Sequence, residues 1–306
     1  MVKFAVAPFM APNVKPSGQQ FEIAHGDRRA VVTEVGATLR EYSVGPERIL
    51  DGFSEDDICS GGRGQLLAPW PNRIRDGFFE FAGENNQLPI NEVARHNAIH
   101  GLVRWVPWRP LEQKAHLVRL AVTLPAQPGY PFTLGLEVAY EVGATGLRVK
   151  ATARNLSDRR APYGFGQHPY LSAGTELVDD LTLTVPARSR LVVNEGLIPT
   201  GERTPADFQA GRRIGDLALD TAFTDLEVSD GIWHVQIEGR YVVRLWGESS
   251  LPYVQLFSGD TLPPGQRRRG LAVEPMSCPA NAFQTGEAVI VLEPGGEISH
   301  SWGLQP

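Results

Sequence analysis

The sequence predicts an all-β fold, a large antiparallel β-sandwich, and two observations carry this prediction. The first is the frequency of helix-breaking residues, because 32 glycines and 24 prolines are spread over 306 residues. The longest stretches free of both, Leu147–Ala161 and Asp216–Asp230, are too short for the long helices of bundles or solenoids. The second is a series of short apolar segments separated by Gly- and Pro-bearing turns, which is typical of a sandwich.

The strongest periodic signal lies at residues 134–154. Apolar residues alternate there with polar or small residues on both sides of a Gly-Ala-Thr-Gly loop. Period-two alternation predicts strands with one apolar and one polar face. Closing the loop places Val142 opposite Leu147, and the next pair joins Glu141 to Arg148, so apolar meets apolar and acid meets base. We therefore expect a half-solvated antiparallel hairpin.

Other short apolar segments, bounded by Gly or Pro, predict the remaining strands. They are Phe4–Met10, Gln20–Ala24, Arg29–Val35, Leu39–Val44, Phe78–Phe81, Leu117–Leu124, Leu181–Val185, Arg190–Val193, Val235–Glu238, Tyr241–Trp246, Tyr253–Ser258, Leu271–Glu274 and Ala288–Leu292. A single helical turn is expected at Asp207–Ile214 or near Ile58. The sequence contains no Ser- or Gly-rich linker, fixed repeat or charge block, so residues 1–306 are predicted to form one domain.

Charge and composition exclude several classes of function. Lysine and arginine number 29 against 35 acidic residues, for a formal net charge of −6, whereas a nucleic-acid-binding domain is usually basic. No apolar run approaches the roughly 18 residues of a membrane span. Two cysteines, Cys59 and Cys278, do not make a disulfide framework. A cytoplasmic protein that binds neither nucleic acid nor membrane is expected.

Two ionisable residues have unusual surroundings. His168 lies in a segment of glycines and aromatic residues, and the following Pro169 favours extended geometry. Glu274 ends the apolar strand that begins at Leu271 and precedes a Pro-rich loop. A carboxylate at the end of a buried strand needs partners or a function, because burying a charge alone is costly. Local context leaves a purely structural role open for both residues.

Three further places carry polar groups suited to ligand binding. Asn72 and Arg73 follow two prolines and Trp70, so a fixed guanidinium and an amide lie beside an aromatic ring, which suits recognition of a polyol. At His100, the following glycine permits close approach of backbone and ligand. Asp220 is an acid among apolar neighbours.

A metal site is not expected at the paired histidines. His96 and His100 have the i, i+4 spacing that binds zinc on a helix. The residues between them lack the glutamate of a metalloprotease helix, and the flanks are rich in Pro and Gly. Both observations argue against a zinc-binding helix.

Taken together, these features follow one another in a set order. They are Asn72-Arg73, His100-Gly101, His168-Pro169-Tyr170, Asp220 and Glu274-Pro275. In this order the sequence resembles the aldose 1-epimerase (galactose mutarotase) family. The most specific match is Glu274–Phe283, which is similar to the family's E-P-x-T-x-P-P-N-A-F run. Val32–Ala37 and Phe78–Ile90 resemble its N-terminal strand with a glycine turn and its aromatic–Gly–Leu hairpin, so the resemblance covers nearly the whole chain.

The resemblance implies a galactose mutarotase-like supersandwich that interconverts the α and β anomers of an aldose. Ring opening requires a base at the C1 hydroxyl and an acid at the ring oxygen, and a carboxylate and an imidazole can serve near neutral pH. The resemblance implies Glu274 as the base and His168 as the acid. It also implies that Arg73, His100 and Asp220 bind hydroxyls of a monosaccharide substrate. The reaction needs no cofactor, metal or covalent intermediate.

Departures from the family's pattern concern the identity of the sugar, and we expect them in or near the pocket. The family commonly has His-Gly-Gly, Asn before the histidine, Phe-Asn after the tyrosine, and Asp-His-x-Phe. This chain has instead His100-Gly101-Leu102, Gln167, Leu171-Ser172, and Asp220-Thr221-Ala222-Phe223. The acid and base positions are unchanged.

Three alternatives remain open. The segment His100–Arg104 also resembles a related branch acting on hexose 6-phosphates, for which Arg104 or the basic run Arg267–Arg269 would provide a phosphate clamp. A non-catalytic carbohydrate-binding protein is a second alternative, although retention of the acid–base pair speaks against it. A glycosidase is the third, with Asp220 and Glu274 flanking a glycosidic bond. The oligomeric state is left open.

Overall fold

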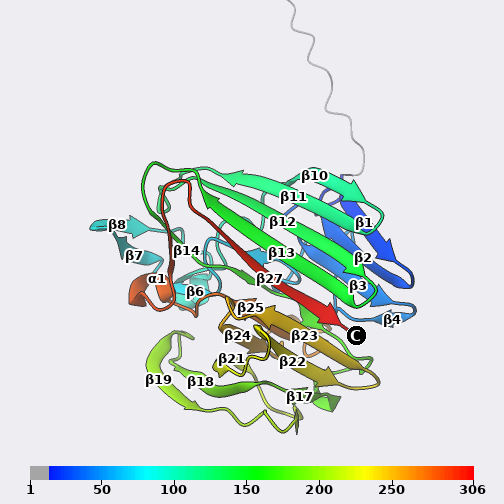
Figure 1. The fold of residues 1–306 in the computed structure, drawn as a ribbon. Coiled ribbons are helices and arrows are strands. Elements are labelled where there is room, and N and C mark those ends of the chain that lie inside the picture. The colour runs from blue at the N-terminus through cyan, green and yellow to red at the C-terminus, as the bar shows by residue number, and fades with distance from the viewer. Residues whose placement is uncertain (1–13) are drawn as a thin grey trace, which may run out of the picture.

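The computed structural model describes residues 14–306 and is built almost wholly from antiparallel strands (Figure 1). This architecture confirms the predicted all-β fold class. The predicted strand Phe4–Met10 lies outside the described residues. Among residues 14–306, no helix is long and apolar enough to cross a membrane.

The largest sheet has nine strands, and the last strand of the chain joins its two halves. In spatial order the strands are β10 (Arg109–Lys114), β11 (Leu117–Leu124), β12 (Leu134–Gly143), β13 (Gly146–Asn155), β27 (Glu297–Gln305), β23 (Val242–Glu248), β22 (Ile232–Glu238), β17 (Thr182–Thr184) and β20 (Arg212–Arg213). Strand β27, red in Figure 1, pairs with β13 on one side and β23 on the other.

The second sheet has eight strands and positions the candidate site. Its main path runs through β19 (Pro199–Pro205), β18 (Ala187–Val193), β21 (Asp220–Leu226), β24 (Tyr253–Phe257), β25 (Leu271–Met276), β15 (Gly166–Gln167) and β5 (Leu66–Leu67). A further short strand, β16 (Tyr170–Leu171), also pairs with β25. Strand β25 therefore pairs with β24 along one edge and with β15 and β16 along the other.

Smaller elements flank these two sheets. A four-stranded sheet contains β1 (Gln20–His25), β2 (Arg28–Thr33), β3 (Leu39–Val44) and β4 (Glu47–Arg48), and β1 and β2 contact β12. Three strand pairs complete the fold: β6 (Arg73–Arg75) with β9 (Asn97–Ile99), β7 (Phe78–Phe81) with β8 (Glu84–Gln87), and β14 (Ala161–Tyr163) with β26 (Ile290–Leu292).

The predicted hairpin at residues 134–154 is confirmed in its register. Val142 pairs with Leu147, and Glu141 pairs with Arg148. The strands extend one residue further than expected on each side, because Gly143 pairs with Gly146, so the turn itself is shorter. The other predicted strands within the described residues are also present, with ends that differ by a few residues.

The prediction of a helical turn at Asp207–Ile214 or near Ile58 is wrong. Neither segment is helical, and part of the first forms strand β20, which pairs with β17 at the sheet edge. Strand pairing therefore decides the local structure where the sequence pattern is weak. The helical elements are α1 (Ala282–Thr285) and the 3₁₀ turns Val93–Arg95 and Val178–Asp180.

The two large sheets share one hydrophobic core. Trp302 of the nine-stranded sheet and Phe223 of the eight-stranded sheet are fully buried in the same cluster. A polar link crosses this core, because Trp302 Nε1 donates to Gln167 Oε1 at 3.0 Å, and Gln167 Nε2 donates to Tyr140 Oη at 2.9 Å. The amide of Gln167, which we expected in or near the pocket, is bonded within this core.

Candidate active site

Glu274 reaches the site because side chains alternate along β25. Leu271 and Val273 belong to the main core. Ala272 and Met276 belong to small clusters on the other face of the strand. Glu274 has the parity of the second pair, so it faces away from the main core. The surrounding chain nevertheless buries it, and its side chain is only 2% exposed.

His168 meets Glu274 from the neighbouring strand ends. It lies between β15 and β16, both of which pair with β25. Its Nε2 is 3.2 Å from Glu274 Oε1. Within residues 14–306, His168 Nδ1 and Glu274 Oε2 are buried without a hydrogen-bond partner. Buried polar atoms usually have a partner, so these two atoms mark a place where we expect a ligand to bind.

Burial shifts both groups of this pair toward their uncharged forms. It raises the pKa of Glu274 well above its ordinary value, and the charge of Asp220 adds to the increase. It lowers the pKa of His168 to about 3, with the positive charges of Arg104 and Arg63 acting in the same direction. Removing a charged group from water is unfavourable, so the neutral carboxyl and neutral imidazole are the favoured state of the buried pair.

Arg73 is fixed beside the pair by a carboxylate that the sequence did not reveal. It begins β6, and its Nε and Nη2 bond to the two oxygens of Glu92 at 2.9 and 3.0 Å. Its Nη1 bonds to Asn72 Oδ1 at 3.2 Å. Its Nη2 also lies 3.9 Å from Asp220 Oδ2. A bidentate ion pair restricts the guanidinium to one orientation.

Asp220 belongs to the same side of the sheet as Glu274. It begins β21, and Gln255 of the intervening strand β24 lies opposite Glu274 in the ladder. Gln255 Nε2 donates to Asp220 Oδ1 at 2.6 Å. Burial raises the pKa of Asp220, while the charge of Arg73 opposes the increase. Gln255 therefore connects the positions of the two acids across the sheet.

His100 is a neutral imidazole of known tautomer. Its Nδ1 accepts a hydrogen bond from the backbone N–H of Asn72 at 3.2 Å. A backbone N–H can only donate, so Nδ1 carries no proton and Nε2 carries it. Burial lowers the pKa of His100 well below its ordinary value, and the charge of Arg104 adds to this. Its ring packs edge to face against that of His168, with the two ring centroids 5.4 Å apart.

A continuous chain of contacts thus connects all six residues that the sequence singles out. In order they are Glu274, His168, His100, Asn72, Arg73 and Asp220. They come from several segments of the sequence: the start of β6, the start of β21, the interior of β25, and the residues that follow β9 and β15. Asn72 and His100 both adopt left-handed backbone geometry, with φ of 55° and 64°.

His96 lies apart from this cluster. It is exposed, and its Nδ1 is 2.8 Å from Asp76 Oδ1. The segment between His96 and His100 forms strand β9 rather than a helix, so the two imidazoles do not share a helix face. No group of three or more His, Cys, Asp or Glu side chains within residues 14–306 is arranged to hold a metal ion.

Sequence reasoning missed several supporting groups. Glu92 and Gln255 have no distinctive local pattern, because their roles come from contacts with distant segments. The glycine run before β5, which is Gly61, Gly62 and Gly64, is a signal in the sequence that points to a close approach of the backbone. A Cβ atom at Gly62 would lie 2.9 Å from His168 Cδ2, and the φ of Gly62 is +76°, in the left-handed region that favours glycine. The run therefore lets the chain pass close to the imidazole.

Cys278 belongs to the packing near the site. Its Sγ would lie 2.5 Å from a Cβ atom at Gly164, so the thiol occupies the space that this glycine leaves. Burial raises the pKa of Cys278 to about 12. The thiol therefore stays protonated near neutral pH and is a poor nucleophile.

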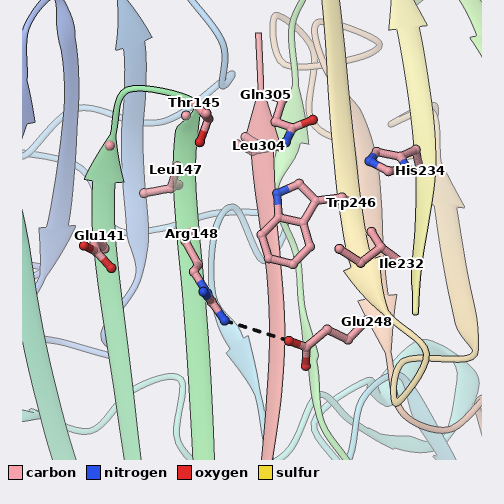
Figure 2. Close-up of a pocket in the computed structure, with 12 residues that line it drawn as sticks. Glu141, Thr145, Leu147, Arg148, Ile232, His234, Trp246, Glu248, Leu304 and Gln305 are labelled. Atoms are coloured by element: carbon pink, nitrogen blue, oxygen red, sulfur yellow. Dashed lines mark ion pairs between the residues drawn. The ribbon is translucent and has the colours of Figure 1, made fainter. Parts of the chain in front are cut away.

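A surface hollow on the nine-stranded sheet lies elsewhere and contains none of the six residues (Figure 2). Its volume is about 430 Å³. Trp246 covers Gly303 there, since a Cβ atom at that glycine would come within 2.6 Å of the indole nitrogen. His234 and the loose ion pair between Arg148 and Glu248, at 4.0 Å, border it. The buried pair, and not this hollow, is where the polar groups converge.

Comparison with known proteins identifies the family of the chain. Residues 19–305 match the family model described as aldose 1-epimerase. The chain is 35% identical to the uncharacterized protein YihR of Escherichia coli strain K12, over 92% of each chain. It is 24% identical to the galactose mutarotase of Homo sapiens, with 78% of this chain and 77% of that one covered.

The fold also matches solved structures. The GalM/aldose epimerase homologue from C. elegans superposes with a TM-score of 0.84 at 19% identity, covering 94% of this chain and 98% of that one. At this identity the likeness shows the fold alone, whereas the match over residues 19–305 shows the family. The chain therefore belongs to the aldose 1-epimerase family and is an isomerase.

Proposed function

We propose that this isomerase interconverts the α and β anomers of a free aldose, with Glu274 as the base and His168 as the acid. The main support is the 3.2 Å contact between Glu274 Oε1 and His168 Nε2. In a cyclic aldose the C1 hydroxyl oxygen and the ring oxygen are bonded to the same carbon. Proton acceptor and proton donor must therefore lie side by side, as these two groups do.

The proposed ring opening moves one proton, in net terms, from His168 to Glu274 through the sugar. Glu274 takes the C1 hydroxyl proton as the carbonyl forms, the bond from C1 to the ring oxygen breaks, and His168 protonates that oxygen. An imidazolium and a carboxylate thereby become two neutral groups. Burial disfavours both charges, so it favours this transfer. Rotation about C1–C2 and the reverse transfers close the other anomer.

Four neighbouring residues are proposed to bind and orient the sugar. Arg73 is held in one orientation by Glu92, so its free N–H groups are preorganised for hydroxyl oxygens. His100 supplies an N–H donor, Asn72 an amide, and Asp220 a carboxylate acceptor. Such mixed donors and acceptors suit hydroxyl groups, which both donate and accept.

The two other readings have less support. A glycosidase needs a second carboxyl group across the scissile bond. Asp220 is bonded to Gln255 and lies near Arg73, whereas the group in contact with Glu274 is an imidazole. A non-catalytic binding protein has no need of a buried acid–base pair, whose burial is unfavourable.

Polarimetry on freshly dissolved α-D-glucose and α-D-galactose tests the proposal. The protein should speed the approach to the equilibrium rotation beyond the buffer-only rate for at least one sugar. Saturable sugar binding without acceleration would favour the binding-protein reading instead. Release of reducing sugar from a panel of glycosides would favour the glycosidase.

A hexose 6-phosphate is a second candidate substrate, and Arg104 favours it. The positive charge of Arg104 contributes to the low pKa of both His100 and His168, so the guanidinium lies close to these two histidines. Among residues 14–306 its Nη atoms bond only to neutral oxygens of Gln65 and Ile99, and its buried Nε has no partner. A largely buried cation without a counter-charge suits an anionic group on the ligand.

The alternative phosphate clamp at Arg267–Arg269 has less support. Arg268 is already paired with Asp179 and Asp260, at 2.8 and 2.5 Å. Arg269 is paired with Asp51 at 2.7 Å. Arg268 and Arg269 thus have carboxylate partners of their own, unlike Arg104, and Arg267 Nε donates to the backbone oxygen of Leu262 at 2.7 Å.

An Arg104→Gln variant separates the two candidate substrates. If the substrate is phosphorylated, kcat/KM for glucose 6-phosphate should fall roughly 10- to 100-fold more than that for glucose, because one charged hydrogen bond is lost. Arg154→Gln, at an exposed arginine, is the matched control. An equal change for both sugars would remove the support for a phosphate clamp.

A further inference from the structure

Tyr170 connects the imidazole of His168 to a buried guanidinium. The rings of His168 and Tyr170 are nearly parallel, with centroids 5.0 Å apart and an interplanar angle of 13°. The guanidinium carbon of Arg63 lies 4.6 Å from the centroid of the same tyrosine ring. Stacked aromatic rings and a cation over an aromatic face are both favourable contacts. The three side chains therefore form one stack that ends at the proposed acid.

The guanidinium end of this stack is firmly anchored. The side chain of Arg63 is only 4% exposed, and its Nε and Nη2 lie 3.3 and 3.2 Å from Asp51 Oδ2. Its Nη1 bonds to the backbone oxygen of Ser60 at 3.1 Å and to Gln266 Oε1 at 3.3 Å. Arg269 pairs with the other oxygen of Asp51. Arg63 therefore has little freedom to leave the tyrosine ring.

The glycine run covers the middle of the stack. Tyr170 Oη donates to the backbone oxygen of Gly61 at 2.8 Å. A Cβ atom at Gly62 would come within 2.9 Å of His168 Cδ2. The loop thus holds the tyrosine hydroxyl and lies against the imidazole edge.

The imidazole itself has few bonds that could fix its orientation. Nε2 contacts Glu274, and within residues 14–306 the buried Nδ1 has no hydrogen-bond partner. Histidines that transfer protons are commonly oriented by a second group that bonds the other ring nitrogen. Here the orientation has to come from packing against the ring faces and edges.

We propose that Arg63 and Tyr170 are positioning residues, which hold the His168 imidazole by stacking in place of a hydrogen bond to its second nitrogen. This inference rests on the proposed function and deepens it. The stack holds the ring while Nε2 contacts Glu274 and, within residues 14–306, leaves Nδ1 without a protein hydrogen-bond partner. A proton donor displaced by about 1 Å can lose up to roughly 10²-fold in rate, so the stack should affect kcat.

The first test compares two substitutions at Tyr170. Tyr170→Phe keeps the ring and loses only the hydrogen bond to Gly61, so kcat should stay within about threefold of wild type. Tyr170→Leu removes the ring, so kcat should fall by roughly 10- to 100-fold with KM little changed. Equal kcat in both variants, with both folded by circular dichroism, would overturn the proposal.

A second test uses Arg63→Gln and does not depend on the fate of Tyr170→Leu. The proposed pair works with one shared proton, so the rate falls when a second proton is added and when the first is lost. The titratable and charged groups that face His168 are Glu274, His100, Arg73, Arg104 and Arg63. Removing the positive charge of Arg63 makes protonation easier, so both limbs of the pH profile should move to higher pH. An unchanged profile with unchanged kcat would contradict the stack.

His168→Asn distinguishes failure of this inference from failure of the proposed function. Loss of activity in His168→Asn with normal kcat in Tyr170→Leu and Arg63→Gln would reject the stack and keep the acid. Near-normal activity in His168→Asn itself would reject the proposed function.

Discussion

Glu274 illustrates how one residue can be favourable for chemistry and unfavourable for stability. It is almost fully buried, and within residues 14–306 its ion-pair partner is the imidazole of His168. Burial raises its pKa, which makes it a stronger base at the pH where it is ionised. The same burial makes its ionisation unfavourable in the folded state.

The sign of this effect gives a prediction for Glu274→Gln. The unfolded carboxyl ionises near its ordinary pKa of 4.5, while the folded one stays protonated to higher pH. The free energy of unfolding of the wild type should therefore fall as pH rises above about 4.5. Glu274→Gln, which cannot ionise, should be more stable than wild type at pH 7.5, and the difference should shrink toward pH 4.

Urea denaturation at several pH values measures this difference. Glu238→Gln, at an exposed glutamate on β22, is the control and should change little. A Glu274→Gln variant that is less stable than wild type at pH 7.5 would indicate instead that the pair is held as a strong ion pair.

At the scale of elements, the glycine run before β5 should matter for activity more than its loop position suggests. Gly62→Ala places a Cβ atom 2.9 Å from the His168 ring, so we expect turnover to fall by roughly tenfold or more as the imidazole shifts. Gly295→Ala is the matched control, because its φ of +72° is close to the +76° of Gly62 and nothing lies within 4 Å.

Both variants carry similar left-handed backbone strain, so both thermal midpoints should fall, and that of Gly62→Ala should fall further because its Cβ also meets the His168 ring. The rates should differ, with Gly295→Ala close to wild type. Equal rates for the two variants would show that the close approach of Gly62 has no bearing on His168.

Strand β23 gives a stability prediction that is independent of the site. A Cβ atom at Gly247 would lie 2.3 Å from Cζ2 of the buried Trp233. Gly247→Ala should therefore reduce the free energy of unfolding by about 1–3 kcal/mol through overpacking. Gly143→Ala, with nothing within 4 Å, is the control.

Chemical denaturation of the two variants provides the measurement. The Gly143→Ala midpoint should remain near that of wild type. A Gly247→Ala variant as stable as this control would mean that Trp233 relaxes without loss of packing.

At the scale of the whole molecule, buried histidines should set the response to acid. Burial lowers the pKa of His300 to about 4 and that of His168 to about 3, and it also lowers that of His100. The unfolded chain binds these protons near pH 6.5, before the folded chain does. Stability from these groups is therefore fully present above about pH 6.5 and is lost as pH falls toward their folded values.

His300 isolates this effect away from the site. Its ring stacks on that of Phe165, with the two centroids 5.5 Å apart, and its Nδ1 lies 3.1 Å from Ser250 Oγ. His300→Gln should show a shallower loss of stability between pH 6.5 and 4.5 than wild type in urea denaturation. The same slope in both proteins would mean that His300 does not contribute to acid sensitivity.

The sequence is informative where one segment carries its own pattern. Both strands of the hairpin at residues 134–154 alternate, and their charged and apolar pairs agree with only one register, which the structure has. The alternation along β25 likewise places Val273 on the core face of the sheet and Glu274 on the other face. Such local patterns were enough for the fold class. The roles of the six candidate site residues come instead from the resemblance to the family, and they stay a prediction.

The rest depends on contacts between segments that are distant in the sequence. Glu92 holds Arg73, and Gln255 holds Asp220, yet neither has a local pattern that reveals its partner. Strand β20 is two exposed arginines that pair with β17 at a sheet edge, so no alternation could reveal it. Gln167 matches a site position in the motif, but its amide bonds to core groups.

Polarimetric rates of wild type, Glu274→Gln and His168→Asn test most directly whether these two residues transfer the protons. Each substitution should slow the enzyme by roughly 10²–10⁴-fold on the best sugar, the usual contribution of a general acid or base. Glu238→Gln and His116→Asn, both at exposed positions, should match wild type. Near-normal turnover in folded Glu274→Gln and His168→Asn would contradict the assignment of base and acid.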